Sequence, residues 1–428
     1  MTKNIEIAIL GLGNIGSEFF EILQKNLPEI EKISDTKIQI SKILVSNINK
    51  SRKLEIDNDI ITDDPEEIFN NTNIDIVVEL MGGINPAYSY VLKCIESNKS
   101  IITANKDLIA SHGKELFSKA KSNNVSILFE AAVASGTPII STLTRDLSYS
   151  NITSIRAIIN GTSNFILSEM EEKNSQFNDA LKLAKDLGYA EPDPTNDIEG
   201  FDARYKLAIL SSLAFNTEID FNDLYVEGIT NIDSIDFQYA KELGYSIKLL
   251  AIAEKSEQNI LARVHPVMIE LNSPLAKISG AMNAVEIKES MLGTLIIQGP
   301  GAGASPTSSG LLSDFISLLK NKNRLSDNVP TLNKKFNIVK IENLESRFYL
   351  RFIVADQAGV LSKMSNILGE ENISIASVIQ KENINLDGKW ADLVFMTYKS
   401  TQSSINQALK KINGLSIVKE LKSLIRVE

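Results

Sequence analysis

The sequence predicts an α/β protein with a doubly wound, mostly parallel sheet, followed by a second α/β domain and a C-terminal βαβ-type module. Three observations support this class. Short apolar runs alternate with helical patterns over the first 150 residues, the pattern changes after that point, and a polar segment broken by Pro330 precedes the last part of the chain. The 428 residues, 43% of them apolar, can form cores for about two to four domains.

The first element is the apolar run IEIAIL, residues 5–10, which is typical of a buried strand. It leads directly into Gly11-Leu12-Gly13-Asn14-Ile15-Gly16, and the helical pattern SEFFEILQKN follows. In this strand–turn–helix order the glycines let the backbone turn sharply and approach a pyrophosphate at the helix N-terminus. We therefore predict a dinucleotide site at these six residues. The alternative is a glycine-rich turn that binds no ligand.

The next strands are predicted to be parallel to the first. The apolar runs KIQISKILVS, IDIVVELMGG, SIITANK and VSILFEAAVASGTPII are separated by helical patterns. Ligands of such sheets bind at the carboxyl ends of the strands, and Lys106 and Glu130 fall at or near two of these ends. Lys106 is therefore predicted to reach a cofactor or substrate. The alternative is a solvated loop lysine.

The second domain contains an acidic segment, GYAEPDPTNDIEGFDARYK, residues 188–206. One helix is expected to end at Gly188, and another is expected from about Ile198, where a helical apolar face begins. Asp202 and Lys206 are four residues apart, so they are neighbours on this second helix. An exposed pair of this kind contributes only ~0.3–0.5 kcal/mol and by itself fits a solvated acidic edge. The nucleotide turn and the second lysine at 106 favour a catalytic pair.

Composition excludes several classes of function. A formal net charge of −10 argues against nucleic acid and anionic membranes as partners, and no apolar run is long enough to span a bilayer. Cys94, the only cysteine, lies in a helical pattern and fits a small core residue better than a nucleophile. Chemistry that needs several histidines is excluded, since only His112 and His265 are present. We expect a cytoplasmic protein that acts on a small-molecule substrate.

The acidic segment belongs to a longer motif, AKDLGYAEPDPTNDIEGFDARYK, which closely resembles the signature of homoserine dehydrogenases. Other motifs of that family occur in the family's order: GLGNIG, TANK at 103–106, EAAVASGTPII at 130–140, NGTSNFIL at 160–167 and GPGAG at 299–303. Near the C-terminus, VADQAGVLSKMSNIL looks like the opening of an ACT domain, a small amino-acid-sensing module. The resemblance covers essentially the whole chain.

This resemblance implies the domain organisation. A Rossmann-type, doubly wound nucleotide domain is expected at 1–150, completed by residues near 300–320. An α/β substrate-binding, catalytic and dimerisation domain is expected at 151–320, then a linker at 321–345 and an ACT domain (βαββαβ) at 346–428.

The resemblance also implies an activity, the NAD(P)-dependent interconversion of L-homoserine and L-aspartate 4-semialdehyde in threonine, methionine and isoleucine biosynthesis. Lys206 would give and take the proton at the reacting oxygen, with Asp202 as its partner. Glu191 and Asp197 would bind the substrate, and Lys106 would lie between cofactor and substrate. The residues expected to bind the cofactor are Gly11, Leu12, Gly13, Asn14, Ile15, Gly16, Lys106 and Gly303.

A monovalent cation, Na⁺ or K⁺, is implied in the same way. Its ligands would be Glu130 and the backbone oxygens of Val133, Ser135 and Thr137. Ser135 stands where glycine is usual in the family. Backbone carbonyls do not depend on the side chain, so the site is still expected.

Cofactor preference is predicted from the end of the second strand. Ser46 and Asn47 stand there, with no acidic residue to bind the ribose 2′-hydroxyl as in NAD-specific sites. Lys50, Arg52 and Lys53 follow and are candidates to bind a 2′-phosphate. We expect NADP(H) to be used at least as well as NAD(H).

For the C-terminal module, the resemblance implies threonine as a ligand and a homodimer or homotetramer. Gly359 stands where a backbone can approach an amino acid at a helix N-terminus. ACT-like modules that serve only as subunit contacts are the alternative. For the whole chain, two alternatives stay open: a catalytically inactive regulator and another amino-acid-type Rossmann dehydrogenase. Aspartate-semialdehyde dehydrogenase is disfavoured because its cysteine nucleophile has no counterpart in the helical pattern around Cys94.

Overall fold

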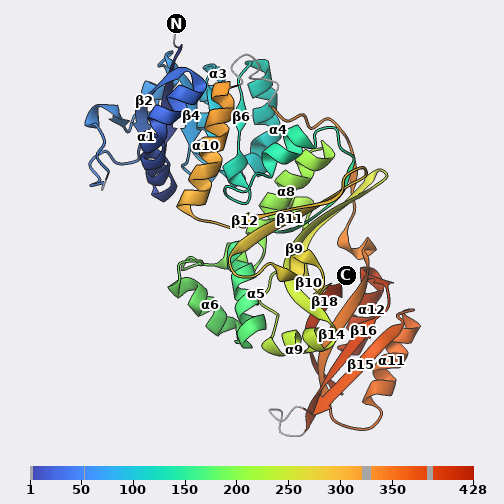
Figure 1. Cartoon of the computed structure of the whole chain (residues 1–428). Coiled ribbons are helices and arrows are strands. Elements are labelled where there is room, and N and C mark those ends of the chain that lie inside the picture. The colour runs from blue at the N-terminus through green and yellow to red at the C-terminus, as the bar shows by residue number, and fades with distance from the viewer. Residues whose placement is uncertain (1–2, 53, 321–328, 383–388) are drawn as a thin grey trace. The chain divides into compact units, whose positions relative to one another are not determined.

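The computed structural model describes residues 3–52, 54–320, 329–382 and 389–428 (Figure 1). The chain forms two compact units. Unit 1 comprises Met1–Ile155, Tyr205–Asn222 and Asn283–Phe336, and unit 2 comprises Arg156–Arg204, Asp223–Met282 and Asn337–Glu428. The chain passes between the units after Asn222, after Phe336, and within β7 (Ile152–Ile158), α8 (Phe201–Phe215) and β11 (Met282–Glu289). In the part of the chain that is described, no helix has the length and apolar character needed to cross a membrane.

Unit 1 is built on a six-stranded sheet in the order β3-β2-β1-β4-β5-β6. Every neighbouring pair is parallel. This order and direction define a doubly wound sheet of the Rossmann type, and the predicted fold class is confirmed. The strands are β1 (Lys3–Leu10), β2 (Thr36–Leu44), β3 (Ile61–Thr62), β4 (Ile74–Glu79), β5 (Ser100–Thr103) and β6 (Ile127–Leu128).

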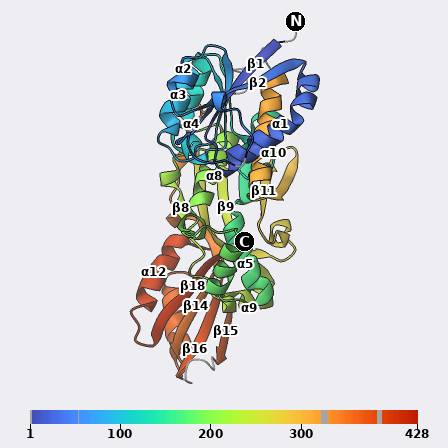
Figure 2. The ribbon, with the colours of Figure 1, turned by 90° about the vertical axis from the view of Figure 1, so that its left-hand side faces the viewer.

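Helices cover both faces of this sheet. Figure 2 shows α1 (Asn14–Ser34) and α10 (Ala304–Lys320) on one side and α2 (Glu66–Phe69), α3 (Ala87–Glu96) and α4 (Lys106–Ser122) on the other. The core between the sheet and the first pair of helices contains Ile7 and Ile9 of β1, Phe19 of α1 and Phe315 of α10, all fully buried. Burying both faces of a parallel sheet requires nearly continuous apolar strands, which explains the composition of IEIAIL.

The expected strand in VSILFEAAVASGTPII is only two residues long, Ile127–Leu128. After Phe129 the chain forms a 3₁₀ turn, and Ala134 and Ser135 adopt positive φ angles of 54° and 55°. The Glu130 carboxylate accepts hydrogen bonds from the backbone N–H groups of Ile140 (2.7 Å) and Ser141 (2.8 Å). These bonds hold residues 130–141 as a closed loop, because the segment can satisfy them only by leaving the extended conformation.

Unit 2 contains strands in the order β9-β10-β18-β14-β16-β15. Residues from β14 to β18 form the βαββαβ succession of an ACT domain, as predicted, with both of its helices packed in one core. The ACT elements are β14 (Glu345–Ala355), α11 (Val360–Glu370), β15 (Ile375–Glu382), β16 (Trp390–Thr397), α12 (Gln402–Ile412) and β18 (Val418–Val427). The short strand β17 (Ser400–Thr401) pairs with β14. The last strand, β18, also pairs in parallel with β10, joining Val267 to Arg426.

The remaining elements of unit 2 precede the ACT domain. They are α5 (Gly161–Lys173), α6 (Phe177–Asp186), α7 (Thr195–Ile198), β8 (Tyr225–Val226), α9 (Ser234–Glu242), β9 (Tyr245–Ser256), β10 (Asn259–Glu270) and β13 (Asn337–Ile338). The strands β9 and β10 form a long antiparallel hairpin. In unit 1, β12 (Gly293–Pro300) precedes the turn that leads to α10.

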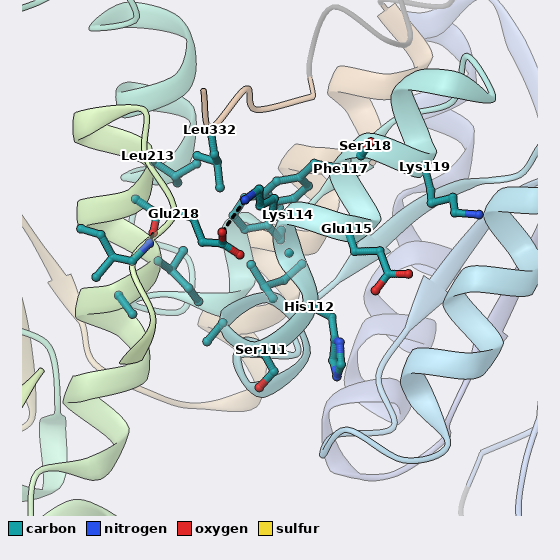
Figure 3. A pocket seen from close by; sticks show the side chains of 18 residues that line it. Ser111, His112, Lys114, Glu115, Phe117, Ser118, Lys119, Leu213, Glu218 and Leu332 are labelled. Atoms are coloured by element: carbon teal, nitrogen blue, oxygen red, sulfur yellow. Dashed lines mark hydrogen bonds and ion pairs between the residues drawn. The ribbon is translucent and has the colours of Figure 1, made fainter. Parts of the chain in front are cut away.

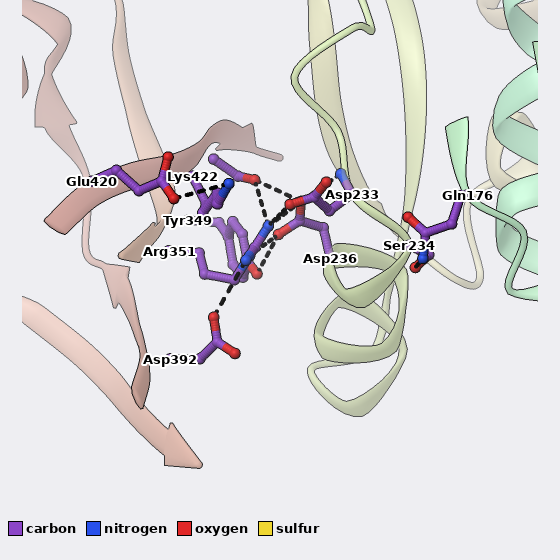
Figure 4. A network of polar contacts seen from close by, with 10 residues as sticks. Gln176, Asp233, Ser234, Asp236, Tyr349, Arg351, Asp392, Glu420 and Lys422 are labelled. Carbon is purple, nitrogen blue, oxygen red and sulfur yellow. Dashed lines mark hydrogen bonds and ion pairs between the residues drawn. The ribbon is translucent and has the colours of Figure 1, made fainter. Parts of the chain in front are cut away.

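A buried polar network connects α9 with the ACT strand β14 (Figure 4). The Arg351 guanidinium donates to both oxygens of Asp236 (2.6 and 3.2 Å) and to Asp233 (2.6 Å). The hydroxyl of Tyr349 donates to Asp236 (2.8 Å), and Ser423 of β18 does so at 2.6 Å. Asp236 is completely buried. The ACT domain therefore belongs to the same compact unit as α9 and the β9–β10 hairpin.

Candidate active site

The glycine turn after β1 opens into a cavity of about 450 Å³. Its lining includes Gly11, Leu12, Gly13, Leu44, Val45, Ser46, Asn47, Lys50, Arg52, Asp63, Leu80, Met81, Pro86 and Tyr90. The structure thus brings the glycine turn together with the end of β2, at the carboxyl ends of the parallel strands. This is the place where a doubly wound sheet binds a dinucleotide.

The turn needs glycine for two physical reasons. Gly11 has a φ of +100°, and a Cβ atom there would be 2.8 Å from the Leu80 carbonyl oxygen. A Cβ on Gly16 would be 2.4 Å from the Gly11 oxygen. Gly13 is the N-cap of α1, and Asn14, Ile15 and Gly16 form its first turn. The free N–H groups and the positive end of the helix dipole at this point attract an anion.

Arg52, one of the basic residues after β2, stabilises the loop in which it lies. The Arg52 guanidinium donates to the backbone oxygens of Asn47 (2.7 Å), Lys50 (2.9 Å) and Ile48 (3.3 Å), which closes the 47–52 loop. Lys50 lines the cavity beside it. Lys53 lies outside the described residues. Asp63, just after the two-residue strand β3, lines the same cavity, and sequence reasoning missed it because so short a strand carries no pattern.

Lys106 is the first residue of α4, and a buried network determines where this helix begins. Its N-cap, Asn105, accepts from Leu108 N–H (3.1 Å) and donates to the Gly83 oxygen (2.6 Å). Thr103 accepts from the Asn105 N–H (2.9 Å) and donates to Glu79 at the end of β4 (2.6 Å). Burial raises the pKa of the fully buried Glu79 carboxyl. The Lys106 side chain is about one-third exposed, 32%.

Gly303 lies at the start of α10, in unit 1. Its φ is +125°, and its carbonyl oxygen accepts from the Thr307 N–H (3.1 Å), as the residue before a helix does. Nearby, Gly301 accepts a hydrogen bond from the Ser135 hydroxyl (3.2 Å). The GPGAG turn therefore packs against the 130–141 loop.

Asn160 positions two carboxylates of the acidic segment. It belongs to the NGTSNFIL motif, but no role was predicted for it from the sequence. Its side-chain amide donates to Asp197 (2.6 Å) and to Asp202 (3.0 Å). Its side-chain oxygen accepts from Ser163 N–H (2.8 Å) and thereby caps α5. Both carboxylates are thus held as hydrogen-bond acceptors by one amide, and Asp202 is only 8% exposed.

The helix that carries Asp202 and Lys206 starts later than expected. The short helix α7 ends at Ile198, and α8 starts at Phe201. Gly200, with a φ of +79°, breaks the helical path between them. The expected start at about Ile198 was therefore wrong. The spacing of apolar residues cannot reveal that a single residue, Gly200, has a left-handed backbone conformation. Asp202 and Lys206 both lie on α8, four residues apart.

The other acids of the segment differ in their surroundings. Glu191 is exposed. Asp193 accepts from the Thr195 hydroxyl (2.6 Å) and N–H (3.1 Å), and the hydroxyl contact lowers the pKa of Asp193. Asp193 therefore shapes the turn into α7. Glu191, Asp197 and Asp202 belong to unit 2, while Lys106, Lys206 and the residues of the nucleotide cavity belong to unit 1.

The loop predicted to hold a cation is buried and rich in oxygen. Glu130 (3% exposed), Val133, Ser135 and Thr137 all lie within it, and none is more than 9% exposed. The buried Thr137 hydroxyl oxygen has no hydrogen-bond partner. Burial also raises the pKa of the neighbouring Asp314 carboxyl, which accepts from the Glu130 N–H (2.8 Å). Nowhere in the described ranges do three His, Cys, Asp or Glu side chains converge as a metal site.

Comparison with known proteins gives the family. A family model of homoserine dehydrogenase matches residues 138–316, that of its NAD-binding domain matches 11–130, and that of the ACT domain matches 348–416. The chain is 41% identical to a homoserine dehydrogenase of Neisseria gonorrhoeae over 433 aligned residues, covering 100% of this chain and 99% of the relative. The chain belongs to the homoserine dehydrogenase family.

Other relatives agree with this membership. The homoserine dehydrogenase of Bacillus subtilis is 34% identical over 100% of this chain and 99% of its own length. The crystal structure of a homoserine dehydrogenase from Thiobacillus denitrificans superposes with a TM-score of 0.91 at 38% identity, covering 100% of this chain and 98% of that one. A hyperthermophilic archaeal homoserine dehydrogenase in complex with NADPH superposes with a TM-score of 0.62 at 27% identity, over 75% of this chain and 99% of that one.

The predicted family is confirmed, and a homoserine dehydrogenase is an NAD(P)-dependent oxidoreductase. The only cysteine of the sequence and one of its two histidines are buried, and burial shifts the pKa of both. Burial raises the pKa of the Cys94 thiol to about 12, so it stays protonated at neutral pH. Burial also holds the pKa of the His265 imidazole well below its usual range, so this ring is neutral. A thiolate mechanism of the aspartate-semialdehyde dehydrogenase type is therefore disfavoured further.

This homoserine dehydrogenase has another cavity, of about 460 Å³, along α4 and α8 (Figure 3). Neither Lys106 nor Lys206 lines it. At its edge Lys114 forms an ion pair with Glu218 (2.5 Å). The His112 ring lies in the lining and stacks on Tyr88 (4.1 Å between ring centres). None of the predicted site residues lies here, so we do not assign the reaction to this cavity.

Proposed function

We propose that this homoserine dehydrogenase reduces L-aspartate 4-semialdehyde reversibly to L-homoserine with NAD(P)H, in the biosynthesis of threonine, methionine and isoleucine. The observation that supports this most directly is the pair of carboxylates, Asp197 and Asp202, that Asn160 holds side by side. Asp202 lies one helical turn before Lys206, the lysine that ends the signature. The substrate carries an ammonium group, and clustered carboxylates attract such a cation.

In the proposed mechanism the nicotinamide, when bound, supplies the hydride. Lys206 protonates the aldehyde oxygen as negative charge develops on it, and takes the proton back in the reverse direction. Asp202 orients the Lys206 ammonium from the preceding turn of α8. Glu191 and Asp197 bind the substrate ammonium, and Lys106 lies between cofactor and substrate.

A spectrophotometric assay tests this function. The purified full-length chain is expected to oxidise NADPH in the presence of L-aspartate 4-semialdehyde, and to reduce NADP⁺ in the presence of L-homoserine. Absence of both reactions would leave an inactive, ligand-sensing regulator as the better description. Turnover of another amino-acid-type substrate in place of homoserine would point to a different dehydrogenase.

The residues of the 130–141 loop fit a monovalent cation. Ala134 and Ser135 are held at positive φ, a strained conformation that commonly accompanies a function. Glu130 contributes a buried carboxylate, and Val133, Ser135 and Thr137 contribute oxygen atoms, the ligands that hard cations prefer. We propose Na⁺ or K⁺. The same assay in sodium, potassium and tetramethylammonium salts at equal ionic strength tests this, since equal rates in all three would argue against a bound ion.

We expect NADP(H) to be used at least as well as NAD(H), and a tenfold preference for NAD(H) in kcat/KM would contradict this. Lys50→Gln is expected to reduce kcat/KM for NADPH by about two- to fivefold, the size of one exposed ion pair, with little effect on NADH. Asp63→Asn is the matched variant, because removing a carboxylate from the same cavity should favour NADPH. Arg52 is less suitable, since its guanidinium closes the loop.

We propose that the ACT domain binds threonine at the N-terminus of α11, between paired domains of a homodimer or homotetramer. Gly359, the N-cap, has a φ of +91°, and a Cβ placed there would meet no atom within 4 Å. A Cβ at Gly359 would thus lie in open space, at the helix end whose free N–H groups attract an anion. The subunit number is measured by light scattering of the purified chain.

Threonine at millimolar concentration is expected to shift the homoserine saturation curve by about 5–150-fold at most, the usual range of allosteric coupling. Gly359→Val should weaken this response and preserve the rate without threonine. If neither threonine, methionine nor isoleucine has an effect, these end products are not the regulators. If the valine variant responds like the wild type, α11 is not the binding position. Deleting residues from 336 onward is a poorer test, because it would remove β18 from β10 and leave Asp236 without Arg351.

A further inference from the structure

The last strand of the chain, β18, carries a buried arginine that contacts two parts of unit 2. Arg426 is 3% exposed, and its Nε donates to the Gln402 side chain at the start of α12 (3.0 Å). Its Nη2 donates to the Tyr225 hydroxyl (3.1 Å), and its Nη1 forms an ion pair with Glu227. Tyr225 in turn donates to Glu227 (2.9 Å). One guanidinium therefore joins an ACT helix to the segment that follows β8.

This segment lies directly against the acidic loop. A Cβ on Gly228 would be 2.2 Å from the Ile198 oxygen and 2.6 Å from the Glu199 Cα, so there is no gap between the two backbones. The Ile229 N–H donates to the same Ile198 oxygen (2.8 Å). A displacement of residues 227–229 must therefore displace the end of α7.

The end of α7 carries Asp197, which shares the Asn160 amide with Asp202. Since Asn160 donates one hydrogen to each acid, a shift of Asp197 changes the bond that orients Asp202. The contacts thus run without interruption from Arg426 through Glu227 and residues 228–229 to Asp197. All of these residues belong to the same compact unit.

The Arg426–Glu227 pair also has room to rearrange. It lines a cavity of about 410 Å³ together with Asn231, Gln402 and Lys422, and the Glu227 side chain is 24% exposed. A pair enclosed in a close-packed core would have a single arrangement, whereas a pair at a cavity wall can exchange partners with water.

We propose that Arg426 is a positioning residue for the reaction: by fixing Glu227 it determines where Asp197 and Asp202 lie when the substrate binds. This inference rests on the proposed roles of these two acids. It also identifies the place where the ACT domain acts on the acidic loop, since both Arg426 and Gln402 are ACT residues. A change in the ACT sheet moves Arg426 directly, because β18 pairs with both β14 and β10.

Kinetics test the proposal with three variants of the full-length enzyme. Arg426→Met and Glu227→Gln are each expected to lower kcat/KM for L-aspartate 4-semialdehyde by about 10- to 100-fold, as small misplacements of reacting groups do. The KM for NADPH should stay within about twofold in both, because the nucleotide cavity makes no use of this pair. Arg426→Lys keeps the positive charge but lacks the forked N–H groups of a guanidinium. Its kcat/KM should therefore lie between those of the wild type and Arg426→Met. Lys422→Gln on the same strand, whose partner is Glu420, is the matched control and should behave as wild type.

Hydrogen–deuterium exchange provides a readout that does not need activity. Arg426→Met should speed exchange of the amides at 195–202 and leave those at 11–20 unchanged. If Arg426→Met fails to fold, Glu227→Gln, which preserves shape, decides the question. Variants that lower the unfolding midpoint but keep both kcat/KM and the 195–202 exchange rates of the wild type would show that the pair is only structural. An inactive wild type with faster exchange in the variant would refute the proposed function while supporting the linkage.

Discussion

Replacing Lys206 with alanine is expected to lower kcat by about 10²–10⁴-fold, the usual contribution of a positioned acid–base group. The reason is that the alkoxide formed by hydride addition must be protonated, and Lys206 is the lysine that ends the signature on α8. NADPH binding should be nearly unchanged, because Lys206 does not line the cavity beside the glycine turn. Steady-state rates and a fluorescence titration with NADPH measure the two effects.

Two further variants separate acid–base chemistry from simple charge. Lys206→Arg keeps the positive charge but cannot release a proton near neutral pH, so it should be about as defective as the alanine variant. Lys182→Ala, an exposed lysine on α6, is the matched control and should retain full activity. If the alanine variant stays within about threefold of wild-type kcat, well below the range for such groups, Lys206 is not the proton donor.

Replacing Arg351 with methionine is expected to reduce the free energy of unfolding of unit 2 by ~3–5 kcal/mol, because it leaves the buried Asp236 carboxylate without its cation. Asp236 is completely buried, and Arg351 holds both of its oxygens (Figure 4). The only tryptophan, Trp390, lies on β16, which pairs with β14, the strand that carries Arg351. Its fluorescence during urea unfolding therefore reports on the ACT domain directly.

The double variant Arg351→Met/Asp236→Asn is the informative comparison. Removing the charge together with its partner should recover part of the loss, since the cost comes mainly from an uncompensated buried charge. Arg351→Lys should be intermediate, because an ammonium cannot reproduce the forked contacts to Asp233 and Asp236. A loss below about 1 kcal/mol for Arg351→Met would mean that water replaces the guanidinium, as at exposed pairs.

The fold could be predicted from the sequence because its signals are local. A buried parallel strand reads as a short apolar run, a dinucleotide turn needs its glycines in a fixed spacing, and a helix repeats its apolar face every 3.6 residues. Residues close together in the sequence were enough to predict three features. These are the strand IEIAIL, the glycine turn at 11–16 and the βαββαβ order of the ACT domain. The errors arose where a local conformation overrides the pattern, as at Gly200, where the path breaks before α8, and in the 130–141 loop.

The chemical types in the candidate site were also readable from the sequence, as a cluster of acids ending in Lys206 and a lysine after a strand at 106. The partners that hold these groups were not, because they lie far away along the chain. Asn160 is 42 residues from Asp202, and Arg426 is 199 residues from Glu227. Spacing at that range carries no signal, since sheet register and backbone packing alone determine which distant side chains meet. The sequence by itself therefore determined the fold class, the family and the candidate reacting groups, and only the tertiary structure decided which distant residues contact the acids among them.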